Sequence, residues 1–235
     1  MKTYLVLALA AAASSAAAST FTSLCDTGVS NCTTESPMTA VDVTDSNFAI
    51  TLLPAGVPSP TVATAILAGG YYQSGTNPIG TNTASWITVW SGGAETQAVG
   101  TFNYQQAITT GSFAGMVPVT ISGTWATDNC GTIAWGTTPV AVTGGTGTVI
   151  SGGVGNCITS SSAFGSLTSF SFTENVTGNT TYYLDFEVGN TGLVTGLLVD
   201  NLSASSIAPT VPEPSSLLLL ASGLAVCASL FRRER

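Results

Sequence analysis

The sequence has almost no positive charge, and this absence excludes several functions. Of its 235 residues none is His, and only four are Lys or Arg. These four are Lys2, Arg232, Arg233 and Arg235, so the segment 3–231 contains no basic side chain. Such a segment cannot neutralise phosphate groups, which excludes nucleic-acid binding. It also cannot form salt bridges, so its stability depends on apolar burial, hydrogen bonds and disulfides.

The missing side chains also remove most catalytic mechanisms. Without His there is no Ser-His-Asp triad, no His-activated Cys and no His-containing zinc helix. A carboxylate pair of the glycosidase type is the mechanism for which residues remain. Its candidates are Asp128, Asp185 and Glu187. We expect Asp185 and Glu187 to lie on a solvated strand face, and Asp128 to form an Asx-type turn with Asn129. We therefore expect a protein that is not an enzyme, with a carboxylate-dependent glycan hydrolase as the alternative.

The first residues have the composition of a secretory signal peptide. Lys2 provides a short positive region, residues 4–13 are mostly apolar, and residues 16–18 are Ala. This succession of charge, apolar run and small residues is what signal peptidase recognises. We predict a signal peptide over residues 1–18, with cleavage after Ala18. An uncleaved membrane anchor is the alternative.

The chain ends in a second hydrophobic segment, residues 211–235. Its first five residues, 211–215, are Val-Pro-Glu-Pro-Ser, and the almost uninterrupted apolar run 216–231 follows. The prolines favour an extended conformation before the run. A helix over residues 215–231 is just long enough to cross a bilayer. The basic residues Arg232, Arg233 and Arg235 stop the transfer, so we expect the tail 232–235 to stay on the cytoplasmic side.

Residues 211–235 resemble the PEP-CTERM sorting signal of Gram-negative bacteria, with Pro212, Glu213 and Pro214 as its motif. The resemblance implies that an exosortase cuts near the motif and transfers the protein to another envelope component, much as a GPI-signal tail is removed. It implies export through the inner membrane, a transient membrane anchor, and a final place at the cell surface or in the extracellular matrix. The same tail is also known as an ice-binding protein C-terminal domain. It indicates a destination and no activity, and a simple tail-anchored protein is the alternative.

The segment 19–210 is the predicted exported domain, and it contains many strand patterns. Residues 182–188 alternate apolar side chains with Asp185 and Glu187, which predicts a half-buried strand with an acidic outer face. The pairs Gly144-Gly145 and Gly152-Gly153 predict turns. Further predicted strands are residues 62–67, 85–90 (an inner strand), 102–105, 117–121, 170–172 and 195–202. Many short strands separated by turns predict an all-β fold, an antiparallel two-sheet β-sandwich.

A second resemblance covers most of this domain. It rests on residues 45–48, 86–87, 101–104, 123–129, 179–186, 190 and 196–197. These segments resemble strands of the jelly-roll, galactose-binding-like domains that occur with PEP-CTERM tails, many of which bind glycans. The resemblance implies a jelly-roll-like sandwich and bears more on the fold than on the activity.

Export permits disulfides, and four cysteines of the exported domain allow three pairings. We predict the local pairs Cys25–Cys32 and Cys130–Cys157, because short loops close easily. Cys227 lies in the apolar tail, where an inert buried thiol is expected. No group of cysteines has zinc spacing, so we predict no metal site and no cofactor.

The sequence contains one candidate site for a metal ion, a structural Ca²⁺. Asp42, Asp45 and Asn47 have oxygen ligands that suit Ca²⁺. A polar loop is the preferred interpretation of these residues.

The aromatic residues suggest a binding function. Most Trp side chains are expected in the core, but Trp135, Tyr71 and Tyr72 stand beside Gly and Thr and are predicted to be exposed. They are the candidate glycan-contact residues. An ice-binding face needs a long flat array of Thr, and Thr81-Asn82-Thr83 is too short to predict one.

Three functions follow from these observations. The first is a non-enzymatic exosortase substrate at the cell surface or in the matrix, whose body binds polysaccharide. The second is a hydrolase of matrix glycans, and the third is a purely structural envelope protein without a ligand.

Overall fold

The structure is a computed structural model that describes residues 21, 24–38, 43–57, 62–65, 84–89, 98–138, 148–154, 167–192 and 195–206, with the backbone alone for 62–65 and 148–154. The predicted signal peptide 1–18 and sorting tail 211–235 lie outside these residues. Within the described ranges no helix is long and apolar enough to cross a membrane. The described residues all belong to one of the two compact units of the chain, Ser19–Ile207.

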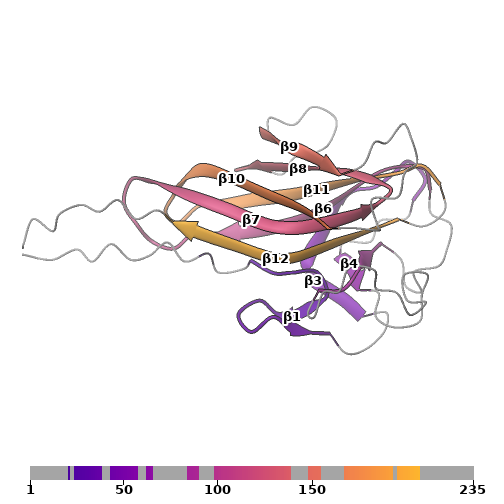
Figure 1. The fold of residues 1–235 in the computed structure, drawn as a ribbon, viewed down its shortest axis with the longest axis horizontal. Coiled ribbons are helices and arrows are strands. Elements are labelled where there is room, and N and C mark those ends of the chain that lie inside the picture. Colours follow the sequence, from indigo (N-terminus) through magenta and orange to yellow (C-terminus); the bar gives the residue numbers. More distant parts are fainter. Residues whose placement is uncertain are drawn as a thin grey trace, which may run out of the picture. The chain divides into compact units, whose positions relative to one another are not determined.

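All regular elements in the described part of the chain are β-strands (Figure 1). They are β1 (Val29–Asn31), β2 (Ser36–Pro37), β3 (Val43–Leu52), β4 (Val62–Ala65), β5 (Ile87–Thr88), β6 (Gly100–Thr109), β7 (Met116–Asp128), β8 (Cys130–Gly136), β9 (Thr148–Val154), β10 (Thr168–Thr177), β11 (Thr181–Asn190) and β12 (Gly196–Ser206).

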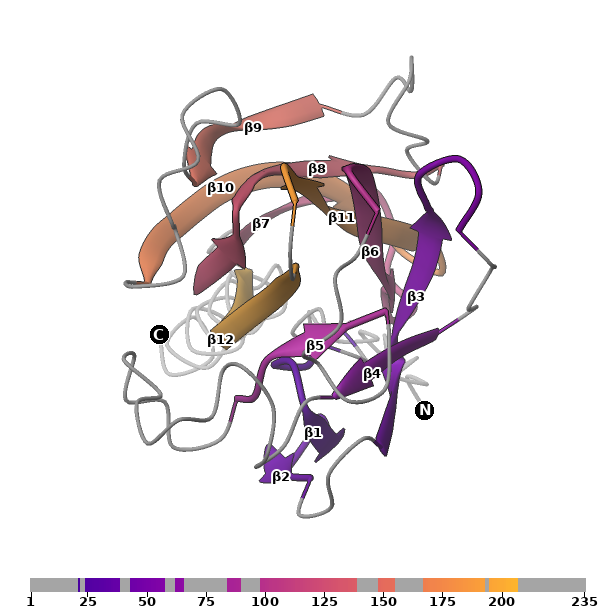
Figure 2. The same cartoon turned by 90° about the vertical axis from the view of Figure 1, so that its right-hand side faces the viewer.

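The strands form two packed antiparallel layers. Hydrogen bonds link ten strands in the order β10-β7-β12-β5-β4-β3-β6-β11-β8-β9, and β1 pairs with β2. One four-stranded layer is β10-β7-β12-β5 and the other is β3-β6-β11-β8. Strand β4 lies where the ladder passes from one layer to the other, and β9 extends the second layer at its edge (Figure 2). The chain is therefore an all-β sandwich, as the sequence predicted.

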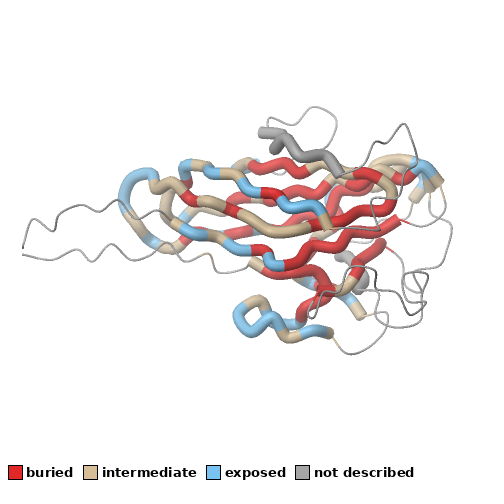
Figure 3. The backbone as a smooth tube through the Cα atoms, viewed as in Figure 1, coloured by how far each residue is buried: buried red, intermediate tan, exposed pale blue. Residues whose placement is uncertain are grey.

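Side chains from both layers meet in one core. The ring centroid of Phe186 in β11 lies 5.9 Å from that of Trp125 in β7 and 6.3 Å from that of Phe170 in β10. Leu184 and Val188 point inward beside Phe186, because every second residue of a strand faces the same side. Burial of one such side chain stabilises the fold by about 1.5–3 kcal/mol. The continuous buried stretch of β7 lies at its end, residues 125–128, and that of β12 at its start, residues 196–200 (Figure 3).

The predicted strands correspond to observed ones, with two differences in detail. The predicted strand 182–188 lies within β11, and its apolar residues are buried as expected. In the predicted inner strand 85–90, only Ile87 and Thr88 form the ladder. Gly152 and Gly153 lie inside β9 and do not form the predicted turn. A Gly pair permits a turn but does not require one, and here β9 pairs with β8.

Candidate functional site

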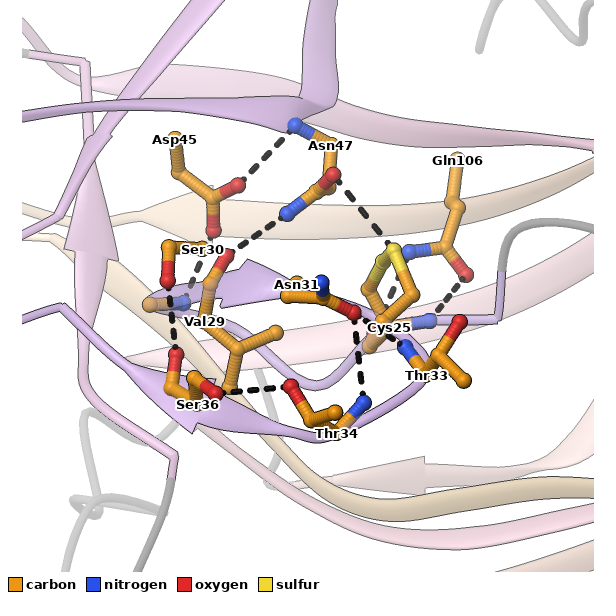
Figure 4. The surroundings of a disulfide bond; sticks show 12 residues. Cys25, Val29, Ser30, Asn31, Thr33, Thr34, Ser36, Asp45, Asn47 and Gln106 are labelled. Carbon is orange, nitrogen blue, oxygen red and sulfur yellow. Dashed lines mark hydrogen bonds between the residues drawn. A yellow bond between two sulfur atoms is a disulfide. The ribbon is translucent and has the colours of Figure 1, made fainter.

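The predicted Cys25–Cys32 disulfide is confirmed. The two Cα atoms lie 4.6 Å apart, and the bond closes the loop that contains β1 (Figure 4). Cys130 is also disulfide-bonded. Its predicted partner Cys157 lies outside the described residues, as does Cys227.

The prediction that Trp135 is exposed is wrong. Its side chain is 4% exposed and stacks on Tyr182, with ring centroids 5.1 Å apart and an interplanar angle of 6°. The edge of Phe172 covers it from the other layer at 5.7 Å. The small residues next to Trp135 in the sequence suggested an exposed side chain, but aromatic side chains from strands distant in sequence cover it. Trp135 is therefore a core residue. Tyr71 and Tyr72 lie outside the described residues.

The outer face of the β3-β6-β11-β8 layer carries an acid–amide cluster. Asp185 Oδ1 accepts hydrogen bonds from Asn103 Nδ2 at 2.7 Å and from Gln105 Nε2 at 2.8 Å. Asn103 Nδ2 also donates to Thr51 Oγ1 at 2.6 Å. Because β11 pairs with β6 on one side and β8 on the other, Asp185 is surrounded by neighbouring strands and is 0% exposed. The prediction that Asp185 is solvated is therefore wrong.

Glu187 lies on the same strand face and is half-buried. Its carboxylate accepts a hydrogen bond from Thr132 Oγ1 of β8 at 3.5 Å. Burial, followed by the negative charge of Asp185, raises the pKa of Glu187. The face thus holds two carboxylates in different environments, one bonded by two amides and one whose pKa is raised by burial. Asp128, the third candidate, is buried elsewhere and accepts a hydrogen bond from Asn129 Nδ2 at 2.7 Å.

The outer face of the opposite layer has a different chemistry. The strands β10, β7 and β12 lie side by side, and their outward side chains carry hydroxyl groups in rows. The strand pairing sets Thr173 beside Thr120, and Ser122 between Ser171 and Ser203. We call the following residues the hydroxyl face: Ser169, Ser171, Thr173, Thr120, Ser122, Thr124, Ser203 and Ser205. They are exposed or partly exposed.

Hydroxyl groups of this face bond to one another across the strands. Thr120 Oγ1 lies 2.8 Å from Thr173 Oγ1, and Ser122 Oγ lies 3.2 Å from Ser203 Oγ. At the far end of the same face Trp86 packs on Ala126 and Leu198, which ends the rows. Sequence reasoning missed this face. The alternation of Ser and Thr with apolar residues in 168–173 and 119–124 was a visible signal, but the rows form only when separate strands pair.

The residues considered for Ca²⁺ form backbone contacts. Asp45 Oδ2 accepts from Gly28 N at 2.8 Å, and its Oδ1 accepts from Asn47 N at 3.0 Å. Asn47 Nδ2 donates to Val29 O at 2.8 Å. Burial raises the pKa of Asp45. The described residues contain no group of three or more acidic, Cys or His side chains arranged for a metal, and Asp42 lies outside them.

Comparison with known proteins identifies the tail. Residues 210–235 match the family model of the PEP-CTERM protein-sorting motif. The chain therefore combines a β-sandwich body with a C-terminal PEP-CTERM motif, which implies processing by an exosortase, export and sorting to the cell surface. No protein with curated function matches the chain.

Two solved structures are similar to parts of the chain. One is the enzymatically active domain of tailspike protein 4 from bacteriophage CBA120, with 14% identity and a TM-score of 0.36; the match covers 69% of this chain and 20% of that one. The other is a CBM4 structure, with 15% identity and a TM-score of 0.29; the match covers 53% of this chain and 72% of that one. The chain thus spans about a fifth of the tailspike chain. At these identities neither likeness bears on activity.

Proposed function

We propose that this protein is a non-catalytic component of the cell surface or extracellular matrix whose sandwich contacts a neutral polysaccharide through the hydroxyl face. The PEP-CTERM motif gives the destination, and the signal peptide 1–18 and the membrane helix 215–231 belong to the same proposal, as does a jelly-roll-like connection of the strands. The observation that carries the polysaccharide contact is the set of exposed, uncharged hydroxyl rows on three neighbouring strands.

The chemistry of the hydroxyl face suits a neutral glycan. Ser and Thr hydroxyls both donate and accept hydrogen bonds, which matches the hydroxyl groups of a sugar. The eight side chains of the hydroxyl face are uncharged, in a chain whose net charge is -8, and the one carboxylate beside them, Asp200 next to Thr124, is 7% exposed. A neutral polymer meets no electrostatic repulsion there, whereas an anionic one is repelled by the rest of the body.

The binding test uses two variants with matched geometry on opposite faces. Thr120→Val with Thr173→Val removes the cross-strand hydroxyl pair of the hydroxyl face. Thr109→Val with Thr181→Val removes a similar pair of β6 and β11, whose Oγ1 atoms lie 3.2 Å apart. On an array of neutral glycans we expect weaker binding for the first variant and unchanged binding for the second. Equal binding by both variants and the parent chain contradicts the assignment to this face.

One observation favours the alternative, a glycan hydrolase. A carboxylate with a raised pKa beside a second, hydrogen-bonded carboxylate is the pairing that glycosidases use for acid and nucleophile or base. Glu187 and Asp185 have this relation, with Glu187 in the role of the acid. Release of reducing sugar from matrix glycans that is lost in Glu187→Gln establishes the hydrolase; no release, together with binding, supports the proposal above.

The sorting step has its own test. In cells without exosortase, we expect the chain to keep its tail and to stay in the membrane fraction, which immunoblotting of fractionated cells measures. Replacement of Pro212 and Pro214 by Ala should give the same result in cells that contain the exosortase. Unchanged size and location in both cases contradict sorting through the motif.

A further inference from the structure

A short segment near the start of the exported body is hydrogen-bonded to strands of both layers of the sandwich. We call residues 25–32 the clasp, because the Cys25–Cys32 disulfide joins its two ends. Residues 25–29 of the clasp are buried. The first three residues of the clasp bond to segments that lie far away in sequence, and Figure 4 shows this for Cys25 and Gln106.

The clasp supplies acceptors for β12 where that strand is irregular. The pairing of β12 with β7 shifts between Asp200 and Ser203, and Asn201 adopts a left-handed conformation with φ of 55°. Asp26 faces this interruption. Its Oδ2 accepts from Asn201 N at 3.0 Å and its Oδ1 accepts from Leu202 N at 2.8 Å. One carboxylate therefore bonds two backbone amides at the irregular part of β12.

The neighbouring residues of the clasp extend these contacts to other strands. Thr27 N donates to Val199 O at 3.0 Å, and Val199 N donates to Thr27 Oγ1 at 3.0 Å. Cys25 N donates to Gln106 Oε1 at 3.2 Å, and Gln106 Nε2 donates to Cys25 O at 3.1 Å. The clasp thus holds β12 of one layer and β6 of the other at the same time.

The path of the clasp leaves little room for alternatives. Gly28 has φ of +72°, and a Cβ at this position would lie 2.5 Å from Ser85 Cβ. Gly28 N donates to Asp45 of β3, and Ser85 N donates to Thr27 O at 2.8 Å. The backbone of the clasp therefore fits against the sandwich in one conformation. The disulfide joins the two ends of the clasp in that conformation.

We propose that the Cys25–Cys32 disulfide is a redox-sensitive closure of the clasp: with the two thiols reduced, the clasp leaves β12 and β6 while the remaining strands stay folded. The disulfide reduces the number of conformations that the undocked segment can adopt. Without it, docking costs more conformational entropy than the hydrogen bonds of residues 25–28 offset. Reducing compartments keep such thiols free and oxidising ones form the bond. An exported chain therefore closes its clasp only after it leaves the cytoplasm.

The bond forms by thiol–disulfide exchange with a disulfide-bearing oxidant, either a thiol oxidase or glutathione disulfide. One cysteine thiolate attacks the oxidant, a mixed disulfide forms, and one thiolate leaves. The second cysteine thiolate attacks the mixed disulfide and releases the other thiolate. Two electrons and two protons pass in total from the cysteine pair to the oxidant and solvent, and the oxidant is reduced to two thiols.

Hydrogen exchange of the purified exported protein tests the closure. We compare the parent chain with Cys25→Ala/Cys32→Ala and follow the amides of Asn201, Leu202 and Val199. We expect these amides to exchange at least about tenfold faster in the variant, because their acceptors have left, while the β6–β11 ladder keeps its protection. Cys130→Ala is the control, since it removes a disulfide outside the clasp and should leave the three amides protected.

Two results overturn the proposal. One is unchanged protection of the three amides in Cys25→Ala/Cys32→Ala. The other is an equal loss in all strands, which shows that the disulfide stabilises the whole sandwich without operating a clasp. If the cysteine variant cannot be purified, titration of the parent chain with glutathione redox buffers gives the same comparison. Asp26→Asn, with the disulfide intact, should speed exchange at Asn201 or Leu202 alone, and no change there removes the role given to Asp26.

Discussion

The strands of both layers alternate inward and outward side chains, but the polar groups of the two outer faces differ in burial and in hydrogen bonding. On β11 and β6 the outward Asp185, Asn103 and Gln105 are buried and bonded to one another. On β10, β7 and β12 the residues of the hydroxyl face remain accessible to solvent, whereas Asp200, Ala126 and Leu198 on the same side of these strands are buried. One face therefore uses its polar groups for stability, whereas the other leaves them available for a ligand.

The largest contrast between the faces should appear in stability. Asp185→Leu leaves the Asn103 and Gln105 amides without this acceptor in a buried place, and an unsatisfied buried group costs about 1–3 kcal/mol. We expect a loss of about 2–4 kcal/mol in the free energy of unfolding, measured by urea denaturation. Thr173→Val on the hydroxyl face serves as the control and should change it by less than about 0.5 kcal/mol. A loss for Asp185→Leu as small as that of the control would contradict the stabilising role assigned to the acid–amide cluster.

The second contrast concerns pH. Burial raises the pKa of Asp26 from 3.8 to about 6, and it raises the pKa values of Asp45, Glu187 and Asp200 in the same direction. The folded state then binds protons more tightly than the unfolded state, so stability should rise as the pH falls from 7 towards 4. One pKa unit corresponds to about 1.4 kcal/mol, and we expect a gain of about 2 kcal/mol from Asp26.

Thermal or urea denaturation between pH 4 and pH 7 measures this gain. Asp26→Asn should reduce the slope of the profile, because the Asp26 carboxyl no longer titrates and only the part from Asp45, Glu187 and Asp200 remains. A protein that loses stability steadily as the pH falls over this window contradicts the assignment. The hydroxyl face contributes nothing to the profile, since its side chains do not titrate in this range.

A smaller change is expected at Glu187, which lies at the edge of the acid–amide cluster. Glu187→Gln removes the repulsion from Asp185 and the penalty for a half-buried charge. We expect a gain of about 0.5 kcal/mol at pH 7, kept small by solvent screening. The gain should vanish at pH 4, where the parent carboxyl is largely protonated. A gain of equal size at both pH values would mean that packing, and not charge, is responsible.

The sequence predicted the inward side chains well, because the period of two in residues 182–188 is a local property. It predicted the exposure of Asp185 and Trp135 poorly, since burial of these side chains depends on neighbouring strands. Asp185 meets Gln105 across 80 residues of sequence, and Trp135 is covered by Tyr182 and Phe172. The Cys25–Cys32 pair was predictable from locality. The bonds from Asp26 to β12, which span 175 and 176 residues, had no local signal.

The smallest stability effect is expected on the hydroxyl face and gives the sharpest test of its role. Thr120→Val removes one hydroxyl of a solvent-exposed cross-strand pair while keeping the β-branched shape. Thr109→Val does the same on the opposite layer. Water replaces the lost partner in both cases, so each variant should lie within about 0.5 kcal/mol of the parent chain in urea denaturation.

Because the two variants should be equally stable, a difference in ligand binding can be assigned to the face itself. Each glycan hydroxyl on the hydroxyl face exchanges a bond to water for a bond to Ser or Thr, and one such bond contributes about 0.5–1.5 kcal/mol. Loss of one contact should therefore weaken binding by about two- to tenfold for Thr120→Val, as measured by calorimetry with a neutral oligosaccharide that binds the parent chain. Weaker binding by Thr109→Val alone would place the ligand on the other layer, which carries the acid–amide cluster. An equal loss for both variants would show that the effect is specific to neither face.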